Sequence, residues 1–360
     1  MKKMNEKIEI ENMSDYDNHE MVSFFYDDKT GLKGFISIHN TNLGSATGGT
    51  RYAEYPNERA ALSDALRLSK AMTYKCALAG LLYGGGKAVI MKDAKHPKTK
   101  EFLYTYAEKV NLLNGNFSTG EDVGISEKDA GILAQKSKFI IGSPEKAGDP
   151  SPWASLGVFY AIRAALKNVF GNEEIKGKTF AVKGLGKVGL ELCRLLYEQG
   201  AEIVAADISE QAIKTAKKKF PKIKIVSSQN IHKEKVDVYS PCAMGNEFNA
   251  KKIGELKCRI VCGGANNQLV SVKDGEGLYK RNILYIPDYL ANGGGVINVV
   301  AELDKGGYNR GRVLEKVKNI QNTAAKIIEM SQKLKKPTNY VADELAKSII
   351  YNKKPILNET

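Results

Sequence analysis

The sequence has few cysteines, a single tryptophan and no CxxC pair. Five cysteines, an odd number without metal-ligand spacing, predict neither a disulfide framework nor a zinc ribbon, and no metal site is expected. Unpaired thiols fit a reducing compartment, so the expected location is the cytoplasm. Cys242 follows a predicted strand, and we interpret it as a packed, unreactive thiol.

Long apolar runs are also missing. No stretch of about 18 apolar residues occurs, so neither a membrane-spanning helix nor a membrane partner is expected. The first residues carry charges with no apolar stretch behind them, which is unlike a secretory signal. At 360 residues, the chain is long enough for two domains.

Positive charge is in excess: 54 Lys and Arg against 41 Asp and Glu give a net charge of +13. A basic balance is compatible with nucleic-acid binding, but here the lysines are spread along predicted helices and arginine is scarce. No aromatic-rich basic motif accompanies them. We therefore expect a lysine-rich solvated surface and no nucleic-acid partner.

Two lysines stand in an unusual stretch, residues 72–87. Lys75 closes a helical pattern that begins near Asn57, and Lys87 follows three glycines at the start of a short strand. An amine in a desolvated site beside another cation is less favoured in its charged form and can act as a general base. The alternative is a glycine turn with both amines reaching water. The stretch alone does not decide between them.

The first part of the chain reads as a small α/β domain with mixed strands. Residues 1–30 show only a possible short helix and turn, 34–39 alternate like a strand, and 47–52 read as a glycine turn into another strand. Asp122 ends a later strand among glycines and is a candidate proton carrier. It could instead cap a helix starting near Ser126 or lie in a surface turn.

The second part contains a dinucleotide-binding pattern. A buried strand at 179–182 leads into the run Gly184-Leu185-Gly186-Lys187-Val188-Gly189, a helix follows, and a second strand ends at Asp207. The glycines let a pyrophosphate approach the helix N-terminus, and the acid bonds the ribose hydroxyls and repels a 2′-phosphate. Strands and helices continue to alternate afterwards. The prediction is a doubly wound parallel sheet that binds NAD.

Three loops follow strands on the expected ligand side of this sheet. They span residues 241–245, 263–268 and 292–298. Since ligands bind at the carboxyl ends of parallel strands, we expect these loops to surround the nicotinamide and the substrate.

These motifs together resemble one family. In the order TGGTR, MTYKCALAGLLYGGGK, GEDVG, GLGKVG, PCAMG, GGANNQL and PDYLANGGGVIN, they match the leucine/phenylalanine/valine branch of the glutamate dehydrogenase superfamily, leucine dehydrogenases most closely. The resemblance runs from about Gly34 to Ala346. It implies an α/β protein with an N-terminal mixed-sheet catalytic domain and a doubly wound Rossmann-type NAD-binding domain. The implied boundaries are 1–145 with 335–360, whose helix returns to the first domain, and 146–334.

The resemblance also implies roles for individual residues. Lys75 would hold the substrate carboxylate, Lys87 would activate water, and Asp122 would exchange a proton with the amino group or water. The further substrate-binding residues implied are Gly48, Gly49, Thr47, Gly120, Asn267, Val296 and Val299. The cofactor-binding residues implied are Gly184, Gly186, Lys187, Val188, Gly189, Asp207, Cys242, Ala243 and Asn266.

The implied reaction is the reversible, NAD-dependent oxidative deamination of an apolar L-amino acid to a 2-oxo acid and ammonia, by a homo-oligomer. Thr47 and Val299 offer no cation for a glutamate side chain, and a buried unpaired carboxylate is costly. Gly120 is expected to enlarge the pocket. Leucine, valine or isoleucine fits, and phenylalanine remains an option.

Two alternatives stay open: a glutamate dehydrogenase, and a catalytically silent NAD-binding regulatory homologue. The second draws on Thr47 and on Ala154, which stands where the family usually has a threonine that bonds the nicotinamide amide. Ser155 might take over that contact.

Overall fold

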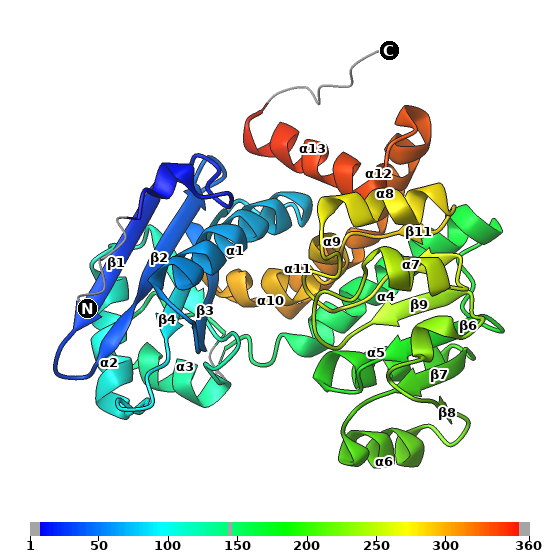
Figure 1. Cartoon of the computed structure of the whole chain (residues 1–360), viewed down its shortest axis with the longest axis horizontal. Coiled ribbons are helices and arrows are strands. Elements are labelled where there is room, and N and C mark those ends of the chain that lie inside the picture. The colour runs from blue at the N-terminus through cyan, green and yellow to red at the C-terminus, as the bar shows by residue number, and fades with distance from the viewer. Residues whose placement is uncertain (1–7, 143–145, 353–360) are drawn as a thin grey trace, which may run out of the picture. The chain divides into compact units, whose positions relative to one another are not determined.

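The computed structural model describes residues 8–142 and 146–352 (Figure 1). It divides into two compact units. Unit 1 holds residues 8–77, 81–142, 146–149 and 299–308. Unit 2 holds residues 78–80, 150–298 and 309–352.

Unit 1 is a five-stranded sheet with helices on both faces. Its elements are η1 (Ile10–Asn12), β1 (Met21–Asp27), β2 (Leu32–Asn40), β3 (Ala46–Ala53), α1 (Glu58–Leu78), β4 (Gly84–Met91), α2 (Lys100–Asn111), β5 (Phe117–Gly120), α3 (Glu127–Ala134) and η3 (Ala301–Leu303). The strand order is β1-β2-β4-β3-β5, antiparallel between β1, β2 and β4 and parallel between β4, β3 and β5. The predicted mixed sheet is confirmed.

Two local predictions in unit 1 were wrong. β1 lies within the first 30 residues, where no strand was expected. The glycines of 47–52, predicted to form a turn, lie inside β3. Those of 84–86 lie inside β4, so the turn that the sequence left open as an alternative there is not formed. A Cβ at Gly48 would stand 1.9 Å from the carbonyl oxygen of Gly86, so glycine here serves close backbone packing in the sheet.

Alternation along β4 separates the two faces of this sheet. Ala88 and Ile90 are buried in a cluster with Phe102 and Leu103 of α2, whereas Val89 is buried with Leu62 and other apolar residues of α1. Because successive side chains point to opposite faces, the odd-numbered residues of β4 face α1. Lys87 is one of them.

Unit 2 alternates helices and strands, with a bundle of helices at its C-terminal end. Its elements are α4 (Ser151–Phe170), β6 (Thr179–Lys183), α5 (Lys187–Glu198), β7 (Glu202–Ala206), α6 (Glu210–Lys219), β8 (Lys224–Ile225), η2 (Ile231–Lys233), β9 (Val238–Pro241), α7 (Ala250–Glu255), β10 (Ile260–Val261), α8 (Val272–Lys280), β11 (Leu284–Tyr285), α9 (Asp288–Ala291), α10 (Gly294–Val300, whose last two residues belong to unit 1), α11 (Arg310–Lys318), α12 (Ile320–Leu334) and α13 (Thr338–Ile350).

The sheet of unit 2 has the order β11-β10-β9-β6-β7-β8 and is parallel throughout. The chain runs outward from β6 through β7 to β8, then returns to place β9, β10 and β11 on the other side. The order therefore reverses between β6 and β9, and a ligand site is expected at the carboxyl ends of these two strands. The predicted doubly wound sheet is confirmed.

The end of the chain differs from the expected boundary. α13 belongs to unit 2, where it packs against α8 and α12. Its apolar residues, including Val341 and Leu345, are buried, and its first residue, Thr338, donates a hydrogen bond to the carbonyl of Tyr285. The segment that does return to unit 1 is 299–308.

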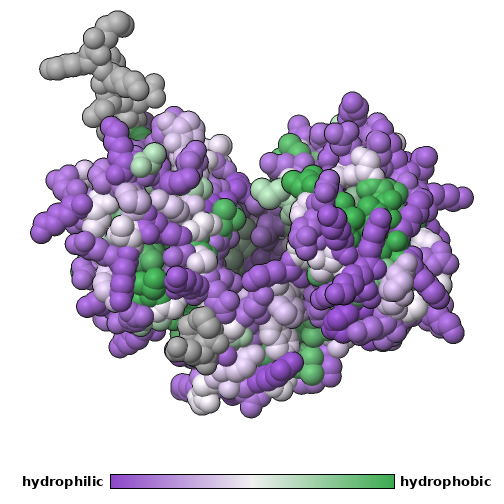
Figure 2. Space-filling view, turned by 90° about the horizontal axis from the view of Figure 1, so that it is seen from below, coloured by the Kyte–Doolittle hydropathy of each residue, from purple (hydrophilic) through white to green (hydrophobic). Residues whose placement is uncertain are grey.

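Hydrophilic residues cover most of the face shown in Figure 2, with apolar patches between them. The lysines at 217, 218 and 219 end α6, whose only buried residue is Ala216. None of the described helices has the length and apolar character needed to cross a bilayer.

Candidate active site

Lys87 lies on β4, on the face of the unit 1 sheet that α1 covers, and only 6% of its surface is exposed. Its ammonium nitrogen is 2.6 Å from Oδ2 of Asp122, just beyond the end of β5. The structure therefore gives this buried amine a carboxylate partner, where the sequence had suggested a second cation. Lys87 and Asp122 stand in separate sequence motifs, and the parallel pairing of β4, β3 and β5 brings them together.

Asp122 is held as a carboxylate. Burial by itself would raise its pKa, but the charges of Lys87 and Arg51 outweigh that effect and lower the pKa to about 2. The residue does not cap the following helix, because Ser126 and Asp129 form a complete capping box there. The interpretation of Asp122 as the cap of this helix is therefore excluded.

Arg51 is a site residue to which the sequence assigned no role. It follows Thr47 and Gly49 at a spacing of two along β3, and its Nε is 3.2 Å from Oδ2 of Asp122. Its Nη1 is 2.9 Å from Oδ2 of Asp64 on α1. The alternation along β3 was the available signal, because residues two apart in a strand share a face.

The other predicted substrate residues of β3 and β5 are tightly packed. A Cβ at Gly120 would lie 2.3 Å from the carbonyl oxygen of Ile141, and one at Gly49 would lie 2.6 Å from that of Glu121. Gly120 thus serves close backbone approach and does not enlarge a pocket, contrary to the sequence-based expectation. Thr47 is 1% exposed, and its hydroxyl has no hydrogen-bond partner among the described residues.

Val299 and Lys75 also lie in or beside unit 1 elements. Val299 belongs to the returning segment, and its Cγ1 would meet a Cβ at Gly142 at 3.3 Å. Glu302 anchors that segment, since its Oε1 accepts hydrogen bonds from the backbone nitrogens of Gly142 at 3.1 Å and Ala147 at 2.8 Å. Lys75 lies in the last turn of α1, where a positive charge suits the helix dipole.

In unit 2 the predicted glycine turn joins β6 to α5. Gly184 has φ +97°, which favours glycine, and a Cβ at Gly189 would lie 1.9 Å from the carbonyl oxygen of Gly184. Nothing lies within 4 Å of a Cβ built at Gly186, and no side chain caps this helix start. The three glycines thus provide a tight turn, an open approach and close packing, as a pyrophosphate site requires. Lys187 and Val188 begin α5.

Asp207 directly follows β7 and is bonded to this turn. Its Oδ2 accepts from the backbone nitrogen of Leu185 at 2.5 Å, and its Oδ1 accepts from that of Ser209 at 2.7 Å. The loop after β9 packs on the same turn, with the nitrogen of Ala243 at 2.7 Å from a Cβ built at Gly184. Burial raises the pKa of Cys242 to about 11, so its thiol is not an activated nucleophile.

The two later loops of unit 2 are linked to each other. Asn292 donates its Nδ2 hydrogens to Oδ1 of Asn266 at 2.7 Å and to the carbonyl of Gly264 at 3.2 Å. Asn267 has φ +52°, and its backbone nitrogen donates to Oδ2 of Asp288 at 2.6 Å. Val296, the remaining predicted residue of unit 2, lies on α10.

Ser155 does not offer a free replacement for the threonine usually found near this site. Its hydroxyl lies 2.9 Å from the carbonyl oxygen of Ser151 and 2.8 Å from that of Val188, and the residue is fully buried. The single hydroxyl hydrogen is already used within the protein, so Ser155 has no further hydrogen to donate.

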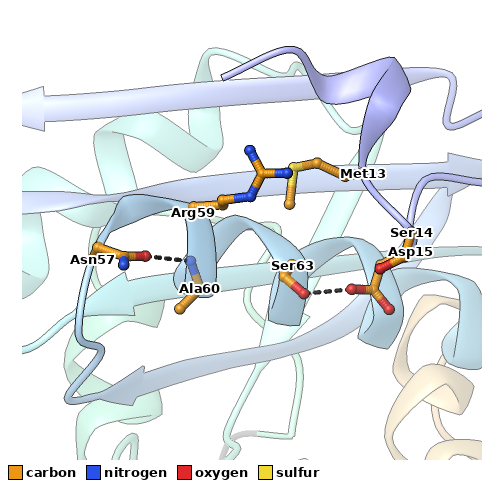
Figure 3. Close-up of a pocket in the computed structure, with 7 residues that line it drawn as sticks. All are labelled: Met13, Ser14, Asp15, Asn57, Arg59, Ala60 and Ser63. Atoms are coloured by element: carbon orange, nitrogen blue, oxygen red, sulfur yellow. Dashed lines mark hydrogen bonds between the residues drawn. The ribbon is translucent and has the colours of Figure 1, made fainter. Parts of the chain in front are cut away.

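A separate pocket of about 250 Å³ lies where the N-terminal segment meets α1 (Figure 3). Its lining residues are Met13, Ser14, Asp15, Asn57, Arg59, Ala60 and Ser63. None of the predicted site residues lines it. Across it, Ser63 donates a hydrogen bond to Asp15.

Two family models match the chain. The Glu/Leu/Phe/Val dehydrogenase dimerisation domain matches residues 18–142, and the Glutamate/Leucine/Phenylalanine/Valine dehydrogenase model matches residues 151–216 and 206–348.

Known proteins match along nearly the whole chain. A leucine dehydrogenase of Bacillus subtilis is 41% identical and covers 94% of this chain and 93% of its own length. A phenylalanine dehydrogenase of Thermoactinomyces intermedius is also 41% identical, with 92% of each chain covered. The crystal structure of L-tryptophan dehydrogenase from Nostoc punctiforme superimposes with a TM-score of 0.81 at 39% identity, over 93% of this chain and 96% of that one.

More distant structures share the fold alone. The hetero-hexameric glutamate dehydrogenase of Thermus thermophilus gives a TM-score of 0.76 at 18% identity. With both family models matched in order and relatives of about 41% identity over 94% of its length, the chain belongs to the Glu/Leu/Phe/Val family of amino-acid dehydrogenases, oxidoreductases that use a nicotinamide cofactor.

Proposed function

We propose that the chain catalyses the reversible, NAD-dependent oxidative deamination of an apolar L-amino acid. The amino acid, NAD⁺ and water give the 2-oxo acid, ammonium, NADH and a proton. The observation that carries the proposal is the buried contact of Lys87 with Asp122 at 2.6 Å, in a chain of this family. A silent regulatory homologue would have no need to keep a buried amine and a carboxylate together.

The roles follow from the chemistry of each side chain. Lys75, half-buried at the end of α1, binds the substrate carboxylate, and Gly48 and Gly49 of β3 offer backbone contacts. When bound, the nicotinamide accepts a hydride from the substrate Cα. Lys87, as a free amine, takes a proton from the water that attacks the resulting imine. Asp122 exchanges a proton with the nitrogen as ammonia leaves, and its contact with Lys87 connects the two transfers.

NAD is the proposed form of the cofactor. Gly184, Gly186 and Gly189 cradle the pyrophosphate against α5, and Asp207 accepts hydrogen bonds from the ribose hydroxyls. The same carboxylate repels the 2′-phosphate of NADP. The loops holding Ala243, Asn266 and Asn267 frame the nicotinamide and the substrate.

The substrate side chain is proposed to be apolar. No cation stands at Thr47 or Val299, so the side-chain carboxylate of glutamate would lose its hydration without compensation. The side chains of leucine, valine and isoleucine suit such an apolar lining. Leucine, phenylalanine and tryptophan dehydrogenases are similar to this chain at comparable identity, so aromatic amino acids are tested as well.

A homo-oligomer is proposed from β1. This strand is an edge of the unit 1 sheet, and among the described residues its outer side pairs with no strand. Phe24 and Tyr26 on it are 52% and 50% exposed, and an edge of this kind invites pairing with a second copy. The matching family model is itself described as a dimerisation domain. The cytoplasm remains the proposed location, because all five cysteines are free thiols.

The test is the formation of NADH, followed by absorbance at alkaline pH, with a panel of L-amino acids and with NAD and NADP in parallel. The panel holds leucine, isoleucine, valine, phenylalanine, tryptophan and glutamate. We expect turnover with apolar amino acids and NAD. Lys87→Ala should lose turnover and still bind NAD in calorimetry.

The matched control is Lys92→Ala, which removes an exposed lysine paired with Glu54 just after the same strand, and it should behave like the wild type. A wild-type protein that binds NAD but turns over none of the panel would refute the proposal and favour the silent homologue. Preference for glutamate would favour the other alternative.

A further inference from the structure

We propose that Arg51 and Asp64 are positioning residues that hold the carboxylate of Asp122 against Lys87. The inference rests on the proposed function, since it assigns Asp122 and Lys87 to the reaction. Neither Arg51 nor Asp64 needs to touch the substrate. Their effect passes through Asp122.

Arg51 bridges two carboxylates on neighbouring elements. Its Nε is 3.2 Å from Oδ2 of Asp122, and its Nη1 is 2.9 Å from Oδ2 of Asp64. Lys87 contacts the same oxygen of Asp122 at 2.6 Å. One carboxylate oxygen is therefore held between an ammonium and a guanidinium, which limits its rotation. A planar guanidinium makes this double contact because its donors diverge in a fixed fork.

Asp64 is itself fixed by the fold. It lies in α1, its side chain is 14% exposed, and its Oδ2 also accepts a hydrogen bond from Tyr55 at 2.7 Å. Its other oxygen, Oδ1, is 2.6 Å from Nη2 of Arg67. Through Asp64, these contacts fix Arg51 to α1. Arg51 in turn fixes the position of Asp122.

The arrangement divides the charge of Asp122 between two cations. Among the described residues, the charged groups bonded around the pair are Arg51 from β3 and, behind it, Asp64 and Arg67 from α1. The titratable hydroxyl of Tyr55 lies on the same side, bonded to Asp64. If Arg51 were neutral, the whole charge of Asp122 would act on Lys87, and each group of the pair would hold its proton to a higher pH. Since deamination needs the free amine, the rise of its rate with pH would move upward.

The experiment compares four single variants and one double variant of the full chain by the pH profile of kcat and by kcat and KM separately. Arg51→Met should move the inflection of the profile upward by about one pH unit and lower kcat by on the order of a hundredfold, with KM for the amino acid little changed. Arg51→Lys keeps the charge and should keep the inflection, but kcat should fall because one ammonium cannot bridge both carboxylates.

Asp64→Asn should lower kcat less than Arg51→Met, and combining the two should add nothing to Arg51→Met alone, because Asp64 acts through Arg51. The matched control is Lys92→Met, which removes an exposed lysine paired with Glu54 just after β4 and should retain the wild-type kcat and inflection. An unshifted inflection in Arg51→Met, or fully additive effects of Arg51→Met and Asp64→Asn, would overturn the inference.

The proposed function can fail separately. If the wild type turns over no amino acid, that proposal fails, and the positioning role is then tested by nuclear magnetic resonance titration of the Asp122 carboxyl. Its pKa should be higher in Arg51→Met than in the wild type, and an equal pKa would contradict the inference. If Arg51→Met does not fold, Arg51→Lys and Asp64→Asn carry the comparison.

Discussion

Replacing His39 by asparagine should remove about 2 kcal/mol of the decrease in unfolding free energy between about pH 7.5 and pH 5. His39 lies on β2, is 2% exposed, and its Nδ1 is 2.8 Å from Oγ1 of Thr73 in α1, two residues before Lys75. Burial, followed by the nearby His19 whose ring centroid is 4.9 Å away, lowers the pKa of His39 from 6.5 to about 4. The folded protein therefore keeps this imidazole neutral where an unfolded chain would protonate it.

The sign and size follow from linkage. Between its unfolded value of 6.5 and its folded value of about 4, the unfolded state binds more protons at His39, so stability falls as the pH falls through this window. A pH of about 5 is roughly 1.5 units below the pKa of the imidazole in the unfolded chain. At ~1.4 kcal/mol per unit, protonation of the unfolded state then lowers the unfolding free energy by about 2 kcal/mol. At about pH 7.5 the contribution is close to zero.

The assay is urea unfolding followed by circular dichroism at both pH values, for the wild type and for His39→Asn. The variant loses packing at each pH, but the difference in unfolding free energy between the two proteins should shrink by about 2 kcal/mol at the lower pH. The control is His96→Asn, at a histidine with 41% of its side chain exposed, for which the difference should not change in this way. An equal difference at both pH values for His39→Asn would refute the reasoning.

Three further predictions concern the two units separately. Asp207→Ala should weaken NAD binding in calorimetry and reduce the ratio of NAD affinity to NADP affinity. An unchanged ratio would show that Asp207 does not contact the cofactor. Gly120→Ala should lower the unfolding free energy by about 1–3 kcal/mol, because its Cβ would stand 2.3 Å from the carbonyl oxygen of Ile141; wild-type stability would show that the backbone yields easily. Phe24→Lys should reduce the mass measured by light scattering by placing a charge on the edge strand, and an unaltered mass would exclude β1 from the interface.

Local patterns carried much of the fold. A strand, a glycine turn, a helix and an acid at the end of the next strand lie within about thirty residues of one another, and this spacing predicted the local fold from β6 to β7 correctly. Alternating strands and helices also predicted the parallel sheet, because each βα unit is stabilised by neighbours close in sequence. Lys87 and Asp122 were identified by resemblance, each from its own motif.

Contacts between distant segments decided the rest. Arg51, Asp64 and Asp122 are far apart in sequence, and they meet because β3 pairs with β5 while α1 covers the same face. The sequence pattern suggested that Gly120 makes space for a substrate, but the segment after Phe139 runs beside β5 and brings the carbonyl of Ile141 against it. Glycine patterns show that something approaches closely, and they do not show whether it is a ligand or the backbone.

The unit on which the last helix packs also depends on tertiary contacts. α13 has one apolar face that could have packed on either unit, and the bonds of Thr338 and the burial of Val341 place it on unit 2. The sequence by itself determined the class of fold and the glycine turn between β6 and α5, because these depend on local spacing, and the resemblance supplied the proposed roles of Lys87 and Asp122. Only the tertiary structure decided which charges surround Asp122 and which glycines serve packing, because those depend on where distant backbones meet.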